Sequence, residues 1–407
     1  MNVWIINPFD NLPLEGYRPM RFWLMAEAFC RAGHNVVYWT SEFSHANKKK
    51  RVLNTECEVP FKLEILETVP YFKNVSLRRF YSHRKLAKTF LKSAQSAINS
   101  GRYSPPNLII ASSPPLELVD AAHSIASKVG AKVIVDIMDA WPETFERIVP
   151  RFLLWPLRRL AKRNYLRAEA ITTVADNYAE LARSYGYTKD ISRFYHGIIL
   201  SGDSPLTNQH KPLPSSLFSF PSSHPSKGTV PLRIVYAGNM GRSYDLKTAI
   251  EAVEMLGDLV TLDIAGKGDQ EASLKAMVNE KGIRGVKFHG YLSNLALSQL
   301  LGECDVGLVP MDPKSCVGIP YKFADYVKNS LAIVSSLGGE SAELLSKYGA
   351  GESYDYGNSS SLVSSIKAIM PRITAMCQAS SKLVEENFDA TKIYDLYVKY
   401  ATKLCAR

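Results

Sequence analysis

The sequence has little of what a disulfide framework, a zinc site or a membrane span requires. Its six cysteines are scattered, with no Cys-x-x-Cys pair and no histidine at metal-ligand spacing, so we expect buried thiols in a reducing compartment. No apolar run approaches the ~18–20 residues that a membrane-spanning helix needs. A strand-like segment begins within the first residues, which predicts that no signal peptide precedes the fold.

Acidic residues are scarce in the first half of the chain. Residues 1–200 hold 28 Lys+Arg against 18 Asp+Glu, whereas residues 201–407 hold 21 of each, so the first half carries the whole formal charge of +10. The 407 residues suggest two domains, at ~100–200 residues per domain. With 46% hydrophobic and 22% charged residues, the chain is expected to be folded and globular.

Short β-branched runs alternate with helical patterns in both halves, which predicts parallel sheets covered by helices on both faces. In the first half we expect strands at 3–7, 35–40, 61–66, 108–112, 132–136 and 170–174. Helices are expected there at 18–32, 81–98, 116–129, 152–167 and 176–185. In the second half we expect strands at 232–237, 260–265, 286–289, 306–309 and 332–335.

This alternation predicts an α/β protein of two Rossmann-like, doubly wound domains. The first spans residues 1–200 and the second 232–388. The segment 201–231 between them has six prolines and eight serines, as expected of a linker or surface loop. Residues 389–407 form a C-terminal helix that is able to pack back on the first domain. Parallel sheets bind ligands beyond the carboxyl ends of their strands, so we expect functional loops to face a cleft between the domains.

Two glycine-containing turns follow strands of the second domain. The first lies in Val235–Asp245, where Asp245 is a plausible helix cap and Arg242 offers a fork that matches phosphate oxygens. The second is Gly266-Lys267-Gly268, where the glycines allow close backbone approach and Lys267 is able to reach a ligand. Taken singly, each is equally typical of an ordinary turn with a solvated cation.

The third motif, Val317–Tyr326, reads Val-Gly-Ile-Pro-Tyr-Lys-Phe-Ala-Asp-Tyr. Pro320 suits the first turn of a helix, and a helix N-terminus attracts anions. Lys322 and Asp325 lie three positions apart, so they share one face of that helix. A cation and a carboxylate in this arrangement suit a nucleotide's diphosphate and ribose, although a capped helix with an ion pair is the simpler alternative.

The order of these motifs, with Phe288–Leu292 and Asp305–Pro310 between the second and the third, resembles the donor domain of retaining glycosyltransferases of family 4, which have the GT-B fold. The first half agrees. Arg21–Val36 resembles the first helix and turn of that family, and Ser112–Pro115 and Asp139–Glu143 resemble segments of its bacterial polysaccharide and O-antigen members. The similarity covers both domains.

The resemblance implies transfer of a sugar from a nucleoside diphosphate donor with retention of configuration. Cations would stabilise the departing diphosphate, in place of a metal ion, because the chain has no Asp-x-Asp motif. No cofactor is implied besides the donor. The paired glutamates of the family fall on Val317 and Asp325, its Asn-Gly on His196-Gly197, and a histidine often found before the Asp-x-Trp-Pro segment on Met138; these departures affect sugar contacts more than nucleotide contacts.

The expected site residues form three sets. Catalytic roles are assigned to Asp139, Arg242, Lys267 and Lys322. Donor binding is assigned to Gly241, Gly266, Gly318, Ile319, Tyr321 and Asp325. Acceptor binding is assigned to Gly16, Arg18, Arg21 and His196. For Asp139 a helix cap or structural ion pair is an equal alternative, and for the two arginines a solvated surface position.

The basic first domain indicates where the protein works. No acidic residue lies between Glu67 and Glu117, and Arg84, Lys88 and Lys92 form a row beside an apolar helix face. Residues 151–167 repeat this style, with Phe152 to Trp155 before five basic residues. Such helices suit an anionic membrane surface, although every doubly wound fold also needs helices that cover its sheet. No nucleic-acid-binding motif is present.

We therefore predict a cytoplasmic glycosyltransferase, peripheral on the inner face of a bacterial membrane, that builds lipopolysaccharide or another surface polysaccharide on a lipid-linked or growing saccharide acceptor. Two alternatives stay open. A sugar-nucleotide epimerase of GT-B fold would use the same donor site without an acceptor, and a non-catalytic homologue would bind saccharide or a partner protein.

Overall fold

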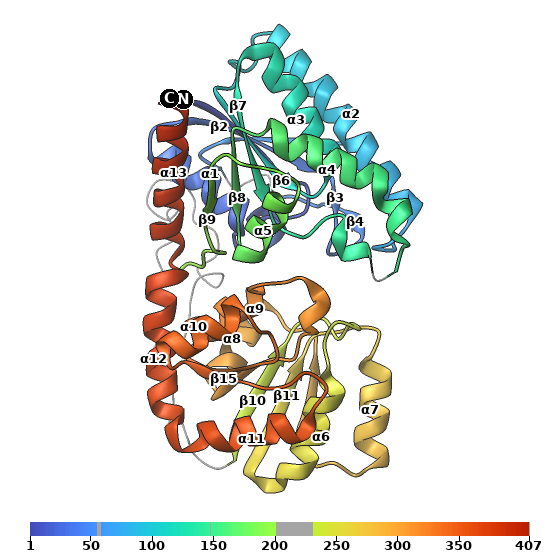
Figure 1. Ribbon diagram of the computed structural model, residues 1–407, viewed down its shortest axis with the longest axis vertical. Helices are drawn as coiled ribbons and strands as arrows, with labels where there is room; N and C mark the ends of the chain where they lie inside the picture. The colour runs from blue at the N-terminus through green and yellow to red at the C-terminus, as the bar shows by residue number, and fades with distance from the viewer. Residues whose placement is uncertain (55–57, 147, 201–230, 407) are drawn as a thin grey trace. The chain divides into compact units, whose positions relative to one another are not determined.

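The computed structural model describes residues 1–54, 58–146, 148–200 and 231–406. Nearly all of the expected linker (201–231) therefore lies outside the described residues, as does Cys57. The described chain divides into two compact units, one of residues 1–197 and 390–406 and the other of residues 198–200 and 231–389. Each is built around a parallel sheet (Figure 1).

The first unit has a seven-stranded sheet in the order β5-β2-β1-β6-β7-β8-β9, with every neighbouring pair parallel. Strands β1 and β6 are buried almost throughout, because helices cover both faces. The six predicted strands are confirmed, whereas β9 and the short antiparallel pair β3–β4 were not predicted. The strands are β1 Asn2–Ile6, β2 Asn35–Ser41, β3 Phe43–Ser44, β4 Lys49–Lys50, β5 Lys62–Leu66, β6 Leu108–Ser113, β7 Lys132–Ile137, β8 Ala170–Thr173 and β9 Ile191–Arg193.

Helices α2, α3 and α4 lie side by side over one face of this sheet (Figure 1). The first-unit helices are α1 Arg21–Arg31, α2 Leu77–Asn99, α3 Leu116–Val129, α4 Trp155–Arg167, α5 Asp176–Ser184 and α13 Ala390–Ala406. Helix α1 begins three residues later than predicted, since Pro19 disfavours a helical Arg18. Helix α2 begins four residues earlier, because the Ser76 hydroxyl accepts a hydrogen bond from the Arg79 amide at 3.3 Å.

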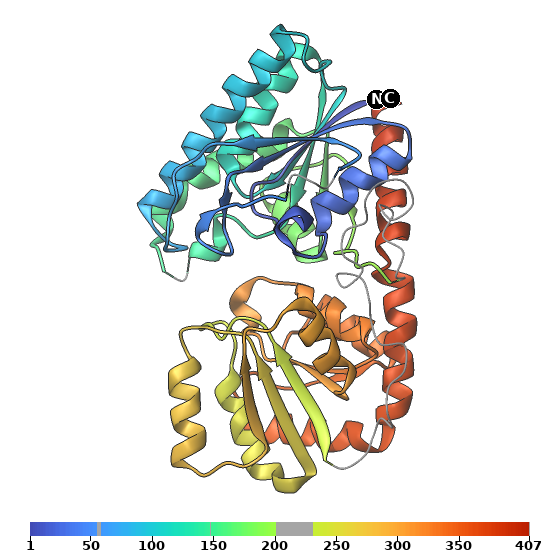
Figure 2. The same cartoon turned by 180° about the vertical axis from the view of Figure 1, so that it is seen from behind.

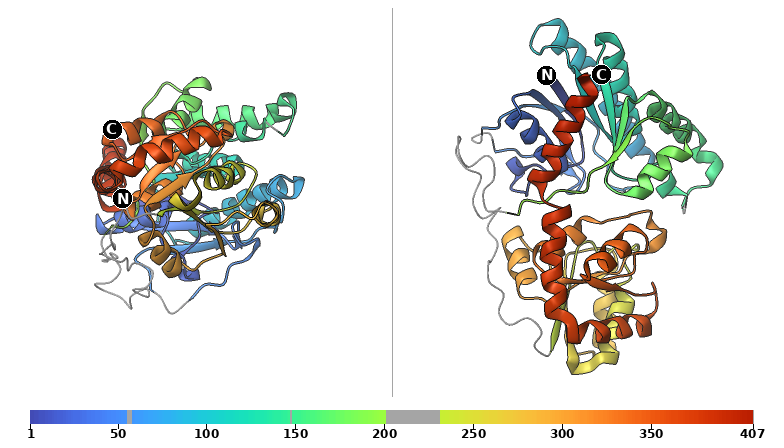
Figure 3. Two further views of the ribbon diagram at one scale, coloured as in Figure 1. Left: turned by 90° about the horizontal axis from the view of Figure 1, so that it is seen from below. Right: turned by 60° about the vertical axis from the view of Figure 1, so that its left-hand side comes forward.

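The C-terminal helix α13 packs beside α1 in the first unit (Figure 3). The Tyr394 hydroxyl accepts a hydrogen bond from the Gly197 amide at 3.2 Å, and the Tyr397 hydroxyl lies 3.1 Å from the Thr172 hydroxyl on β8. The last described helix therefore completes the core of the unit that the chain begins. No helix of the described residues is long and apolar enough to cross a membrane.

The second unit has a six-stranded parallel sheet in the order β12-β11-β10-β13-β14-β15 (Figure 2). The strands are β10 Leu232–Ala237, β11 Val260–Ala265, β12 Val286–Gly290, β13 Val306–Val309, β14 Ala332–Ser335 and β15 Gly351–Ser353. The helices are α6 Leu246–Leu256, α7 Glu271–Glu280, α8 Asn294–Gly302, α9 Tyr321–Lys328, α10 Glu340–Tyr348, α11 Ser359–Ile369 and α12 Ile373–Asn387. All five predicted strands are present, and the short β15 is additional. The prediction of two Rossmann-like doubly wound units is confirmed.

Helix α9 packs closely on the sheet because β13 has a glycine, without a side chain, at the point of contact. A Cβ at Gly307 would lie 2.3 Å from Cδ2 of Tyr326, so the tyrosine ring occupies the space that a side chain would fill. The Tyr326 hydroxyl accepts a hydrogen bond from the Ala237 amide at 2.8 Å, where β10 ends. These contacts hold α9 beside the carboxyl end of β10.

Candidate functional site

Two turns meet at the carboxyl edge of the second sheet. After β10, the Gly238 amide donates to the Ala265 carbonyl at 2.9 Å, and the Met240 amide donates to the Lys267 carbonyl at 3.0 Å. The glycine turns that the sequence placed after neighbouring strands are therefore in direct backbone contact. This is the edge at which parallel sheets bind ligands.

Glycine is required where these turns touch. Gly266 has φ +133°, and a Cβ there would lie 1.9 Å from the Gly238 carbonyl oxygen. A Cβ at Gly268 would lie 2.5 Å from the Met240 carbonyl. Any side chain at either glycine would separate the turns, so the glycines keep a compact surface of backbone beside the strand ends.

Lys322, in the first turn of α9, points its amine at this surface. The side-chain nitrogen lies 3.7 Å from the ring centroid of Tyr244 and 4.1 Å from that of Tyr236. A Cβ built on Gly238 would lie 3.0 Å from the same nitrogen. The residue is 9% exposed, and the nitrogen has no hydrogen-bond partner among the described residues. The predicted first-turn position of Lys322 is confirmed.

Burial lowers the pKa of Lys322 well below its usual value, while the Asp325 carboxylate acts in the opposite direction. Two tyrosine rings attract the ammonium, at about 0.5–2 kcal/mol each, but they donate no charge to neutralise it. A buried polar group without a partner costs about 1–3 kcal/mol or more if charged. An anion at the glycine turns would supply the missing partner.

The loop before α9 differs in one detail from its prediction. Pro320 is the N-cap residue in an extended conformation, so the helix begins at Tyr321, and no side chain caps that end. The Gly318 carbonyl accepts a hydrogen bond from the Ser341 hydroxyl at 2.5 Å, which ties the loop to α10. Ile319 is buried and Tyr321 and Asp325 are half-buried.

The other predicted cations remain at the surface. Arg242 and Lys267 are exposed on the turns after β10 and β11, so both are reachable from solvent near Lys322. Asp245 caps α6 as predicted, accepting a hydrogen bond from the Thr248 amide at 3.1 Å. The structure therefore brings Gly241, Gly266, Lys267 and Lys322 to one edge of the sheet.

Sequence reasoning missed three side chains that shape this edge. Tyr236 and Tyr244 form the aromatic walls around Lys322. The side-chain amide of Gln270 donates to the Gly241 carbonyl at 2.5 Å and to the Tyr244 carbonyl at 3.2 Å, which holds the first turn in place. The two tyrosines flank the Gly238–Gly241 turn in the sequence, and this position could have indicated that they line the site. No sequence feature indicated a role for Gln270.

In the first unit, the predicted residues occupy three environments. Asp139 follows β7, is half-buried, and accepts a hydrogen bond from the Ala140 amide at 2.8 Å; burial raises the pKa of its carboxyl, and Arg79 opposes that rise. Gly16 is exposed with φ +82°, and Arg18 is half-buried. His196 is 6% exposed, and burial lowers its pKa well below the usual value.

Arg21 is a correction to the predicted acceptor set. Its guanidinium is fully buried and binds both carboxylate oxygens of Asp136, at 3.0 and 2.8 Å. It also donates to the carbonyls of Phe194 and Tyr195 at 2.8 and 3.0 Å. Four of the five N–H donors of an arginine are thereby used inside the unit, so the structure places Arg21 in the interior and not at the solvated surface position that the sequence suggested.

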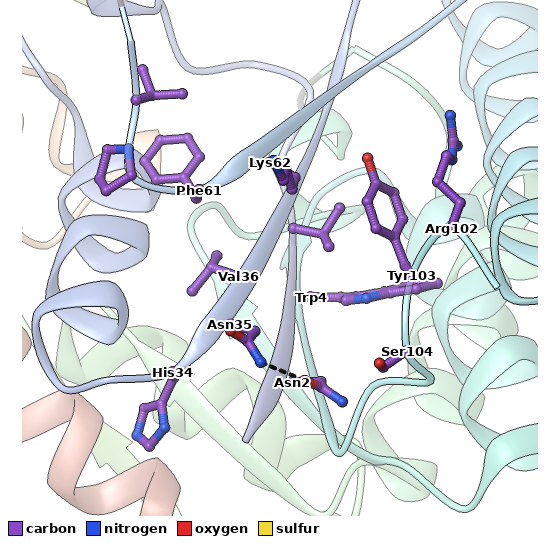
Figure 4. Close-up of a pocket in the computed structure, with 13 residues that line it drawn as sticks. Asn2, Trp4, His34, Asn35, Val36, Phe61, Lys62, Arg102, Tyr103 and Ser104 are labelled. Atoms are coloured by element: carbon purple, nitrogen blue, oxygen red, sulfur yellow. Dashed lines mark hydrogen bonds between the residues drawn. The ribbon is translucent and has the colours of Figure 1, made fainter.

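A surface pocket of about 310 Å³ lies elsewhere in the first unit, at the amino ends of β1, β2 and β5 (Figure 4). Trp4, Tyr103 and Arg102 line it, and the Asn35 side chain donates to that of Asn2 at 3.2 Å. It lies at the edge of the first sheet opposite to the loops that carry Gly16 and Asp139. Within the described residues, no group of three or more His, Cys, Asp or Glu side chains is placed to hold a metal ion.

Comparisons with known proteins agree with this geometry. Residues 231–371, which contain the glycine turns and Lys322, match the family model of glycosyl transferases group 1. No curated protein matches the chain in a sequence comparison.

Solved structures match over the full length. Sucrose-phosphate synthase from Thermosynechococcus elongatus has 12% identity and a TM-score of 0.73, over 100% of this chain and 99% of that one. Anabaena Alr3699/HepE in complex with UDP and glucose has 13% identity and a TM-score of 0.66, over 99% and 100%. The lipopolysaccharide outer core galactosyltransferase WaaB has 14% identity and a TM-score of 0.64, over 99% and 100%.

At these identities the structural matches establish the fold, which is GT-B. Together with the family match of the second unit, they support a glycosyltransferase of GT-B fold.

Proposed function

We propose that the protein is a retaining glycosyltransferase that moves a sugar from a nucleoside diphosphate sugar to a lipid-linked or growing saccharide in bacterial surface polysaccharide synthesis. The observation that carries this proposal is the buried Lys322 amine, which lies against Gly238 and has no hydrogen-bond partner among the described residues. A diphosphate at the carboxyl edge of the second sheet would give that amine its counter-ion.

In this proposal the donor diphosphate lies on the backbone of the glycine turns. Lys322 binds it from the buried side, and Arg242 and Lys267 from the exposed side. As the sugar leaves, negative charge grows on the diphosphate, and fixed cations aimed there lower the barrier. Gly241, Gly266, Gly318, Ile319 and Tyr321 shape the donor site, and Asp325 binds ribose hydroxyls.

We propose that the cations do this without a metal ion or cofactor. The chemistry then needs a carboxylate close to the sugar or the acceptor hydroxyl, and Asp139 is our candidate. Burial raises the pKa of its carboxyl above the usual value, a direction that suits general acid–base catalysis. Gly16, Arg18 and His196 remain candidates for acceptor contacts.

UDP is the first nucleotide to test, because HepE was solved in complexes with UDP and with UDP-glucose. The lipopolysaccharide role of WaaB supports the polysaccharide context.

We also propose that the first unit binds the cytoplasmic face of an anionic membrane. Phe152 and Trp155 are 75% and 60% exposed before and at the start of α4, and Leu77 is 87% exposed at the start of α2. The row Arg84, Lys88 and Lys92 on α2 is exposed, as predicted, and forms no ion pair in the described structure. Such a combination of aromatic tips and cations suits an anionic bilayer surface.

The structure changes which cations of the first unit support membrane binding. The apolar side of α2 (Leu86, Phe90, Ala94 and Ala97) is buried against the sheet, so it is not a membrane face. On α4, Arg158 pairs with Glu146, and Arg163 and Arg167 pair with Asp120. The α2 row and the exposed aromatic residues are therefore the stronger basis.

One assay tests the activity and separates the alternatives. The full chain is incubated with labelled UDP- and GDP-sugars, with and without bacterial membrane lipid. Transfer to lipid supports the proposal. Conversion of the nucleotide sugar without acceptor indicates an epimerase, and neither reaction indicates a non-catalytic binding protein.

A further inference from the structure

A group of basic side chains that the proposed reaction does not use lies at the carboxyl edge of the first sheet. We name it the Arg79 cluster, and define it as Arg79 in the first turn of α2, His45 and Lys48 between β3 and β4, and the rings of Phe9 and Tyr71. Its members come from three separate parts of the chain. No motif in the sequence joins them.

The guanidinium of Arg79 is held by aromatic rings. Its central carbon lies 4.7 Å from the ring centroid of Trp141, 5.7 Å from that of Phe9 and 5.8 Å from that of Tyr71. The residue is 8% exposed, and one terminal nitrogen donates to the Asn74 carbonyl at 2.8 Å. These contacts fix the plane of the guanidinium before any ligand arrives.

No ion pair in the described structure includes the Arg79 guanidinium, although the charges of Asp139 and Glu117 favour its cation. Its Nε has no hydrogen-bond partner among the described residues. A buried guanidinium is normally paired with a carboxylate, because an uncompensated buried charge is costly. The aromatic rings thus hold the Arg79 guanidinium in place, while no carboxylate is in direct contact with it.

A second cation lies on the same tyrosine. The Lys48 amine is 4.9 Å from the Tyr71 ring centroid, 2.5 Å from the Asn74 side-chain oxygen and 3.3 Å from His45 Nδ1. His45 Nδ1 is in turn 2.5 Å from the Tyr71 hydroxyl. All of these partners are uncharged groups, so Lys48 has no counter-ion in the cluster either.

The charge of Arg79 acts on both neighbouring basic groups. Burial and the charge of Arg79 lower the pKa of Lys48 to about 8, and burial with the charges of Arg79 and Lys48 lowers the pKa of His45 to about 3. Asp139 and Glu117 are the carboxylates whose charges favour the Arg79 cation, and neither forms an ion pair with Arg79 or Lys48 in the described structure. An anion at the cluster would give both cations the direct partner that they lack.

We propose that the Arg79 cluster binds a phosphoryl group of the acceptor. The fixed guanidinium offers its Nε–H edge, the geometry that arginine uses for phosphate oxygens, and Lys48 supplies a second positive charge beside it. A phosphoryl group has enough oxygens and charge for both. That the phosphoryl group belongs to an acceptor rests on the proposed glycosyl transfer. The binding of an anion is argued from the cluster alone.

The probe is pyrophosphate, titrated calorimetrically into the full chain with UDP in excess to occupy the donor site. We expect binding that weakens at least about tenfold in Arg79→Gln and in Lys48→Gln. Lys85→Gln, exposed on the same helix as Arg79 and given no role in binding, is the control and should stay within about twofold of wild type. Arg79→Lys, which keeps the charge and loses the fork, should fall between wild type and Arg79→Gln.

Thermal unfolding of each variant shows whether it is folded, and Lys48→Gln, on a half-buried turn, tests the site if Arg79→Gln unfolds. Unchanged affinity in both Gln variants, or no binding by wild type, overturns the proposal. A separate UDP titration keeps the two proposals distinct. UDP binding without pyrophosphate binding contradicts only the Arg79 site, and pyrophosphate binding that depends on Arg79 without UDP binding contradicts only the donor site.

Two further probes identify the source and the class of the anion. Binding of decyl phosphate in preference to a soluble sugar phosphate supports a lipid-linked acceptor, and the reverse supports a free phosphorylated saccharide. Acetate should bind at least about tenfold more weakly than either. Equal binding of acetate would overturn the phosphoryl assignment.

Discussion

The side-chain nitrogen of Lys322 lies 3.7 Å from the ring centroid of Tyr244 and has no hydrogen-bond partner among the described residues. The ring attracts a cation without neutralising it. Lys322 is thereby kept in place, with its charge available to a ligand. The relationship explains why a lysine is found at a buried position of a fold that it does not stabilise.

Replacing Lys322 with alanine should abolish sugar transfer without unfolding the chain. Loss of one fixed donor to developing charge typically costs about 100-fold or more in rate. The free protein should be at least as stable as wild type, because the substitution removes a buried amine without a partner. Transfer rates and thermal unfolding measure the two effects. Lys347→Ala, exposed on α10, is the control, and near-normal turnover of Lys322→Ala would refute the assignment.

At a pH where the Lys322 amine of the free protein is neutral, donor binding should be accompanied by proton uptake. The folded-state pKa of Lys322 is lowered by burial, so between that value and about 10.5 the unfolded chain holds a proton that the folded chain lacks. In that window the contribution of this group to stability increases with pH. An anion favours the ammonium form, so binding should restore up to about one proton per site.

Calorimetry of UDP binding in buffers of different ionisation enthalpy, from about pH 7 to pH 10, measures this uptake. Lys322→Arg stays charged over the range and should show none from this position. Equal proton uptake by wild type and Lys322→Arg would contradict the prediction.

Gly266→Ala should destabilise the second unit and abolish donor binding. The added methyl group would lie 1.9 Å from the Gly238 carbonyl oxygen at φ +133°, so the two turns must separate. We expect the free energy of unfolding to fall by at least about 2 kcal/mol. Gly282→Ala is the matched control, since it has φ +62° and no atom within 4 Å. It should cost only about 1 kcal/mol, and a similar loss at both positions would show that backbone strain alone is responsible.

Arg21→Met should destabilise the first unit by about 3–5 kcal/mol, because it leaves the Asp136 carboxylate buried and unpaired. Arg31→Met removes an arginine that pairs with Asp395 at the surface and should cost no more than about 1 kcal/mol. Denaturant unfolding monitored by fluorescence gives both values. A variant at Arg21 with unchanged stability and a raised KM for acceptor would restore the role that the sequence suggested.

Replacing both Phe152 and Trp155 with serine should weaken binding to vesicles that contain anionic lipid. Each exposed aromatic residue is expected to contribute about 1.5–3 kcal/mol when inserted, so the loss for the pair should be about 100-fold or more in vesicle co-sedimentation. Serine at Met255 and Leu295, exposed in the second unit, is the control. Wild-type binding should also fall with added salt, because the α2 cations act through screened charge. Unchanged binding of the Phe152 and Trp155 variant would exclude this surface.

The sequence predicted best what depends on local periodicity. The eleven predicted strands, the cap at Asp245 and the first-turn position of Lys322 are confirmed, because each follows from residues close together in the chain. Helix ends shifted where a single residue dominates, as at Pro19 and Ser76.

Tertiary contacts could not be predicted in the same way. Arg21 looked like a loop arginine, yet its partner Asp136 lies more than a hundred residues away on β7. The Arg79 cluster combines residues after β1, between β3 and β4, and at the start of α2, so no spacing in the sequence marks it. The aromatic walls around Lys322 also arise only when α9 packs beside β10.

Helix α13 has a consequence for synthesis on the ribosome. It packs on α1, and its Tyr397 is fully buried in the first unit. The ribosome makes this helix only after the whole second unit. Until then, the apolar face of α1 that α13 covers stays exposed to water. The second unit, continuous from β10 to α12, can fold first. The part of the protein that emerges earliest is therefore the last to be completed.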